Sequence, residues 1–133
     1  MNLSTLSVLI LAFVTLAAMQ VQAIIIYDHP VGITFGQTAR MTAANTGARA
    51  ITIIGVTFLD SEGNVLGQFP TETIEPGKMI SFDLNADDIV RENSRIQIRI
   101  VLSADTSRGL VTSTEVFEND TGKTTVFIGN PDA

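Results

Sequence analysis

The sequence predicts an all-β fold, an antiparallel β-sandwich of about seven strands preceded by an N-terminal signal helix. Two observations support the sandwich. In several segments apolar residues recur at every second position, which is the periodicity of a strand with one buried face. Residues that favour turns separate these segments at intervals of about 8–12 residues. An uncharged stretch at the start of the chain predicts the signal helix.

The clearest strand covers residues 95–102. Apolar side chains take every second position there: Ile96, Ile98, Ile100 and Leu102. Arg95, Gln97 and Arg99 fall between them, so one face is buried and the other is solvated. Residues 79–84 repeat this alternation, and residues 38–44 do so with mostly small inward residues.

Residues 51–59 are apolar at both alternating sets of positions, which predicts a central strand covered more fully than the others. Gly55 in this segment indicates a β-bulge or a close approach of another backbone. Four further segments fit strands, the last two of them as short edge strands: 110–118, 123–128, 64–69 and 24–27.

Turn-forming residues lie between these segments at 45–47, 60–64, 75–78 and 119–122. Pro76 and Gly77 suit the central pair of a type II turn. Residues 86–90 predict one helical turn that crosses between the sheets. Short strands joined by such regular turns are typical of an immunoglobulin-like sandwich.

The first charged residue is Asp28, and residues 3–18 form an apolar run interrupted only by Ser and Thr. Val21 and Ala23 suit signal peptidase, so residues 1–23 are a predicted signal peptide and residues 24–133 a single β-sandwich domain. An uncleaved anchor over residues 3–26 is the alternative, since it could span the ~30 Å hydrocarbon core of a membrane; a buried helix is a third. The first two place the domain outside the cytoplasm.

All charged side chains follow the leader and give a net charge of −6. This balance argues against nucleic acid as a partner, because such binding needs a basic patch. It also argues against docking on anionic lipid, so a membrane would be touched only through the N-terminal segment if that segment stays uncleaved. The chain has no Cys, so an exported domain must depend on its apolar core; we expect the periplasm, the cell surface or the extracellular space of a bacterium.

The residues predict no enzyme, no cofactor and no metal. The single histidine, His29, precedes Pro30 and is expected in a loop, and no Cys is available as a nucleophile. Residues 60–64 carry oxygen side chains at alternate positions, as a calcium loop does. An EF-hand, however, needs Gly at its sixth position, and Gly63 is the fourth. A hairpin turn explains this segment better.

Two sets of residues are candidates for partner contact. Four arginines would form one basic stripe if segments 38–44 and 95–102 were neighbours, and otherwise they lie on a solvated outer face: Arg40, Arg49, Arg95 and Arg99. Four apolar residues would begin the cleaved chain: Ile24, Ile25, Ile26 and Tyr27. Exposed residues of this kind need a sheet edge to pair with, either in the same molecule or in a neighbouring subunit, as in donor-strand complementation.

Five segments occur in an order that resembles exported bacterial immunoglobulin-like domains with no assigned biochemical role: VGITFGQTAR (31–40), NTG (45–47), FLDSEG (58–63), IEPGK (74–78) and EVFENDTGKTTV (115–126). The resemblance covers nearly the whole chain after the leader. It implies the fold and an exported location, and it brings no catalytic residues. The chain lacks the Cys pair and the Trp of antibody domains.

The expected function is therefore a non-catalytic exported module for protein–protein contact or structural assembly at the bacterial envelope or exterior. Its partner would be another protein or further copies of the same chain. The alternative is a ligand-binding accessory domain that recognises a glycan, a peptide or calcium through the turns at 60–64 and 119–122.

Overall fold

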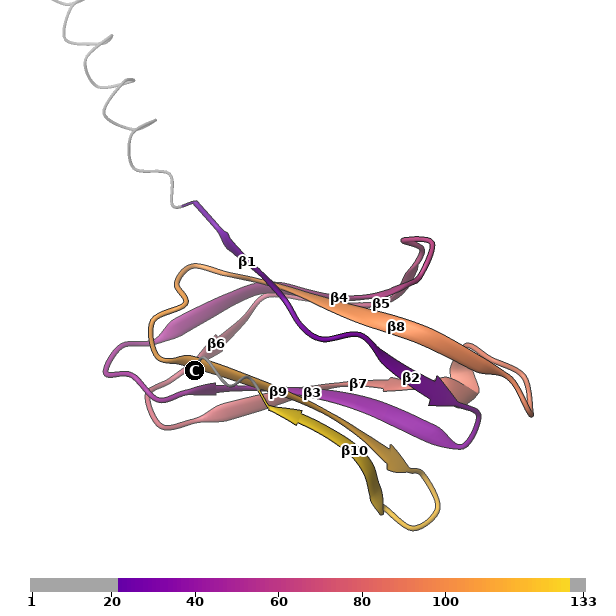
Figure 1. Ribbon diagram of the computed structural model, residues 1–133. Helices are drawn as coiled ribbons and strands as arrows, with labels where there is room; N and C mark the ends of the chain where they lie inside the picture. Colours follow the sequence, from indigo (N-terminus) through magenta and orange to yellow (C-terminus); the bar gives the residue numbers. More distant parts are fainter. Residues whose placement is uncertain (1–21, 130–133) are drawn as a thin grey trace, which may run out of the picture.

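The computed structural model describes residues 22–129, and these form two antiparallel sheets packed face to face (Figure 1). The predicted all-β antiparallel sandwich is confirmed. The predicted leader, residues 1–23, and its alternative as an anchor over residues 3–26 lie almost entirely outside the described residues.

The described residues contain ten strands, more than the seven or so expected. Six strands form the first sheet: β1 (Ile24–Tyr27), β2 (Val31–Thr34), β4 (Ile51–Asp60), β5 (Val65–Phe69), β6 (Glu72–Ile74) and β8 (Arg95–Ala104). Four strands form the second: β3 (Gln37–Asn45), β7 (Met79–Asn85), β9 (Leu110–Glu118) and β10 (Thr124–Gly129). Strands β2 and β6 were not predicted, because segments of four and three residues are too short to show a period of two.

In the first sheet β8 and β4 are the central pair. Strands β1 and β2 follow each other along the free edge of β8, and β5 and β6 do the same along β4. The second sheet has the order β10-β9-β3-β7. The pairs β3–β7 and β4–β8 correspond to B–E and C–F of an immunoglobulin domain. The first and last strands differ from that fold, because they join the opposite sheets. Here β1 and β2 pair with β8, the counterpart of F, and β9 pairs with β3, the counterpart of B.

The core lies between the sheets and follows the alternation in the sequence. On β8, Ile98, Ile100 and Leu102 are buried, and the alternating residues Arg95, Gln97 and Arg99 are exposed, as expected. On β3 the buried apolar residues are small apart from Met41, and most of the larger core side chains come from other strands. Three aromatic rings join the two sheets by edge-to-face contacts with centroids 5.8 and 5.3 Å apart: Phe58, Phe69 and Phe82.

Strand β4 is central, as predicted, but only one of its faces is fully buried. Val56 and Phe58 are inaccessible, whereas Ile54 is 41% exposed on the outside. The register with β8 shifts between Ile53 and Gly55, which confirms the predicted bulge. The expectation that this strand is covered more fully than the others was wrong, because β3 and β9 have no exposed residue and no further layer packs on the outer face of β4 within the described residues.

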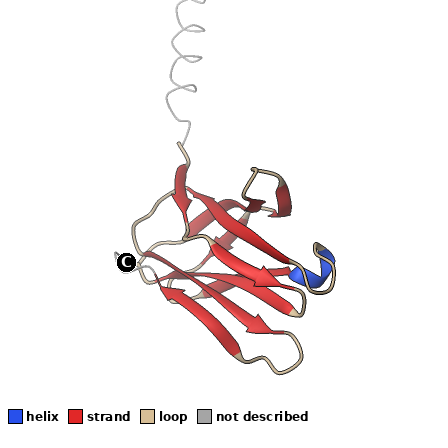
Figure 2. Cartoon of the chain, turned by 45° about the vertical axis from the view of Figure 1, so that its right-hand side comes forward, coloured by secondary structure: helices blue, strands red, loops and turns tan. Residues whose placement is uncertain are grey.

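Two of the predicted connections, the turn at Pro76 and Gly77 and the helical turn after residue 85, are confirmed. Gly77 has φ 75°, and the N–H of Lys78 donates to the carbonyl of Glu75 at 3.0 Å. The 3₁₀ helix η1 (Ala86–Asp88) leads from β7 in one sheet to β8 in the other. Figure 2 shows η1 (blue) at one end of the two sheets.

Candidate functional site

The apolar residues of β1 pair within their own molecule. Ile24 to Tyr27 run antiparallel to β8, opposite Ala104 to Val101. Asp28 then ties the strand to both sheets. Its N–H donates to the carbonyl of Ile100 at 3.0 Å, and its carboxylate accepts a hydrogen bond of 2.6 Å from the fully buried hydroxyl of Thr114 on β9. The intramolecular alternative from the sequence is therefore the one observed. Strand donation by β1 to a neighbour would require this pairing to break.

Strand β10 exposes apolar side chains that the sequence did not single out. It is the outermost strand of the second sheet, with β9 on one side and no strand of the described chain on the other (Figure 1). Phe127 is 67% exposed and Val126 is 40% exposed, while Ile128 packs against the core. Residues 124–129 contain no charge and no Pro. The backbone of β10 therefore presents an edge that neither a charge nor a proline protects against pairing with another strand.

The other edges carry the usual protection against unwanted pairing. Pro30 interrupts the edge formed by β1 and β2, and Pro70 interrupts the edge formed by β5 and β6. Strand β7 carries Asp83, a charge on its outer face. Pro and charge on an edge strand are common devices against strand addition. Within the described residues, β10 is thus the longest edge segment without either device.

The condition for a basic stripe is not met, because segments 38–44 and 95–102 lie in different sheets. Arg40 lies on the outside of the second sheet, where its guanidinium donates two hydrogen bonds to Asp83 at 2.7 and 2.8 Å and lies 5.0 Å from the ring centre of Phe117. The hydrogen bond to Asp83 raises the pKa of Arg40. Arg95 and Arg99 lie on the outer face of β8, in the first sheet. Alternation showed correctly that the three side chains point outward, but it holds no information on which sheet a strand joins.

The two turns proposed for ligand binding do not form one site. Both lie at the η1 end, the turn at 60–64 beside the first sheet and the turn at 119–122 beside the second (Figure 1). The Asp60 carboxylate accepts hydrogen bonds from the backbone N–H groups of Glu62 and Asn64, and the side chain of Asn64 adds another. These bonds lower the pKa of Asp60. A cavity of about 340 Å³ adjoins this turn and Arg99.

The turn at 119–122 is held by side-chain hydrogen bonds to residues of β3 and β7. The side chain of Asn119 accepts from Thr38 at 2.5 Å and donates to Asn85 at 2.9 Å. No group of three or more His, Asp or Glu residues within 22–129 could hold a metal ion. The cavity beside the turn at 60–64 includes no residue of the turn at 119–122.

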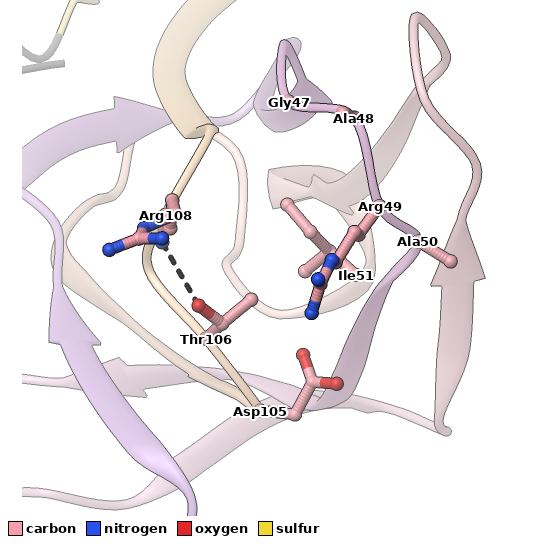
Figure 3. A pocket seen from close by; sticks show the side chains of 8 residues that line it. All are labelled: Gly47, Ala48, Arg49, Ala50, Ile51, Asp105, Thr106 and Arg108. Carbon is pink, nitrogen blue, oxygen red and sulfur yellow. Dashed lines mark hydrogen bonds between the residues drawn. The ribbon is translucent and has the colours of Figure 1, made fainter.

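A larger cavity, of about 650 Å³, lies at the opposite end of the sandwich and was not predicted (Figure 3). Two loops form it, the one from β3 to β4 and the one from β8 to β9. Its lining includes Arg49, Arg108 and Asp105 among small residues. Of these, the sequence singled out only Arg49, and in a different grouping. The two loops are far apart in the chain, so no local pattern could connect them.

No family model, curated protein or solved structure was found to match this chain. The resemblance to exported bacterial immunoglobulin-like domains therefore stays a prediction. Residues 22–129 contain no helix with the length and apolar character needed to cross a membrane.

Proposed function

We propose that the protein is a non-catalytic, exported β-sandwich module that contacts other proteins at the bacterial envelope or exterior. The observation that carries the proposal is the unprotected β10 edge, with its exposed Val126 and Phe127. The exported location rests on the predicted leader, residues 1–23.

The contact would form by addition of a strand to β10. An edge strand leaves every second pair of backbone N–H and C=O groups unbonded, and an extended segment of another protein can satisfy them. A bulge lies between Thr124 and Val126, so the regular part of the edge begins at Val126. Phe127 would then supply apolar contact beside the new strand.

A second copy of the same chain is the simplest partner. Two β10 strands can pair antiparallel about a two-fold axis, which gives each copy the same contacts. The chain carries a net charge of −6, so two copies repel each other over most of their surfaces. This repulsion is weaker at β10 than at a charged edge, because the residues of β10 carry no charge, although Glu115 of β9 lies opposite Phe127.

Two matched lysine variants test the proposal. Phe127 and Met79 are 67% and 70% exposed and lie on opposite edges of the same sheet. Sedimentation velocity over a range of concentrations should show self-association of the unaltered chain, much weaker association of Phe127→Lys, and unchanged association of Met79→Lys. Cross-linking in an envelope fraction gives the same comparison for a different partner. If the unaltered chain is monomeric and captures no partner, or if both variants behave alike, the proposal is wrong.

A further inference from the structure

The cavity between the β3–β4 and β8–β9 loops has the size of a small-molecule site. Its volume of about 650 Å³ falls within the range of about 300–1,000 Å³ that is usual for ligand pockets. Ile51, at the start of β4, contributes an apolar wall and is almost fully buried. Figure 3 shows the side chain of Arg49 directed into the cavity, toward Asp105. The site is independent of β10 and of any strand addition there.

A buried asparagine holds the first of the two loops. Asn45, at the end of β3, is only 2% exposed, and all of its side-chain polar atoms are engaged. Its Nδ2 donates to the carbonyls of Arg49 at 2.7 Å and Ile74 at 2.9 Å, and its Oδ1 accepts from the N–H of Gly47 at 3.0 Å. The backbone that carries Arg49 is therefore fixed before any ligand arrives.

The second loop is fastened to the first through glycine. Gly109 has φ 78°, and a Cβ atom there would lie 2.7 Å from the backbone nitrogen of Gly47, so only glycine allows this approach. The N–H of Thr46 donates to the carbonyl of Gly109 at 2.8 Å. Asp105 and Thr52 exchange two further hydrogen bonds of 3.0 Å each. Such a frame lowers the entropy cost of binding, because both walls are already ordered.

The net charge of the residues that line the cavity is positive, whereas the net charge of the whole protein is negative. Arg49 and Arg108 bring two positive charges and Asp105 one negative charge, whereas the chain carries −6. Arg40–Asp83 is the only salt bridge among residues 22–129, so neither arginine of the cavity makes a direct ion pair, although Arg49 points toward Asp105. Asp105 already accepts a hydrogen bond from the backbone of Thr52. The two guanidinium groups thus leave donors free for an anion.

We propose that this cavity binds a carboxylate group, carried either by a small free acid or by an acidic peptide. A guanidinium matches the planar geometry of a carboxylate with two parallel hydrogen bonds. The lining contains no aromatic side chain on which a sugar ring could stack, and its small residues, Gly47, Ala48 and Ala50, leave room beside the arginines. A neutral glycan fits this lining poorly.

Titration of the ¹⁵N-labelled protein at low salt, with amide shifts as the readout, tests the proposal. Citrate serves as the free acid and a tetrapeptide of glutamate as the peptide, each in a separate titration. We expect shifts confined to residues 46–51 and 105–109. Arg49→Gln and Arg108→Gln should each weaken binding at least about ten-fold, the loss expected for a hydrogen bond to a charged group. Arg49→Lys should weaken it less, because the charge stays while the two-point geometry is lost.

Arg91→Gln is the matched control, since Arg91 is exposed just after η1, at the other end of the molecule, and should leave binding unchanged. A response to citrate alone identifies a free acid as the ligand class, and a tighter response to the peptide identifies a polypeptide. The proposal is overturned if neither probe shifts these loops at millimolar concentration, or if both Gln variants bind like the unaltered chain. Titrations in the Phe127→Lys background remove association through β10, so this result does not depend on the proposed function.

Discussion

The two edge strands of the second sheet, β7 and β10, differ in how much they contribute to the core. At one edge, β7 places Phe82 and Leu84 in the core and lies against β5 of the other sheet. Its outward Asp83 is held by Arg40. At the other edge, β10 contributes only the partly buried Ile128 to the core. One edge therefore closes the sandwich and stabilises it, while the other adds little to the core and leaves its backbone open to another strand.

The largest expected difference between the edges is in the cost of losing one phenylalanine. Phe82→Ala should lower the free energy of unfolding by about 3–5 kcal/mol, because it leaves a cavity beside Phe69. Phe127→Ala should change it by no more than about 0.5 kcal/mol, since the side chain is exposed. Urea unfolding of both variants measures this contrast, and equal losses would show that β10 belongs to the core.

A second prediction concerns the edge of the first sheet. Asp28→Ala removes the acceptor of the buried Thr114 hydroxyl and should cost about 1–3 kcal/mol. Amide hydrogen exchange should become faster in β1 and remain unchanged in β7. Thr114→Val removes both the hydroxyl and its need for a partner, so Asp28→Ala should cost less in that background. Additive effects of the two substitutions would contradict the bond between them.

The ion pair between Arg40 on β3 and Asp83 on β7 is expected to protect the β7 edge more than it stabilises the fold. Both side chains are more than a third exposed, so Arg40→Gln should cost no more than about 1 kcal/mol, and less at high salt. The double variant with Asp83→Asn leaves β7 without charge and should raise self-association through this edge. Sedimentation at matched concentration checks this, and an unchanged molecular mass would mean that charge is not what separates the two edges.

The smallest effect concerns the turn that joins β4 to β5. The hydrogen bonds from Asn64 lower the pKa of Asp60 below the usual value of about 3.9. A group with a lowered pKa in the folded state stabilises the fold above its unfolded pKa, and this contribution is lost as the pH falls through its folded pKa. Asn64→Ala should therefore raise the pKa of Asp60 toward the usual value. An NMR titration of the carboxyl carbon measures it, and an unchanged pKa would refute this cause.

The sequence predicted those parts of the fold that depend on local alternation. Residues 95–102 are long enough for a period of two to identify the buried face, and this agrees with β8. Residues 110–118 were predicted only as a strand, which is β9; its buried face includes Thr112 and Thr114, so apolar alternation does not identify that face. Alternation cannot tell to which sheet a strand belongs, so the sequence left open whether Arg40 and Arg95 share a face; they lie in different sheets.

The candidate sites depend on contacts between distant parts of the chain, and the sequence predicted them less well. The apolar character of residues 24–27 correctly indicated a strand that needs a partner edge. The exposure of Phe127 follows from the place of β10 in the strand order, which no local pattern gives. The cavity that contains Arg49 and Arg108 depends on the close approach of Gly109 to Gly47. Each glycine by itself indicates only a turn, so the sequence does not show that the two loops meet.

Amide hydrogen exchange along β10 tests the central claim most directly, because strand addition engages its backbone. With increasing protein concentration, or on binding of an envelope partner, the amides of β10 that point away from β9 should become protected, while those of Met79 and its neighbours on β7 should not change. Association that leaves the amides of Val126 to Ile128 as fast to exchange as in the dilute protein would contradict the account.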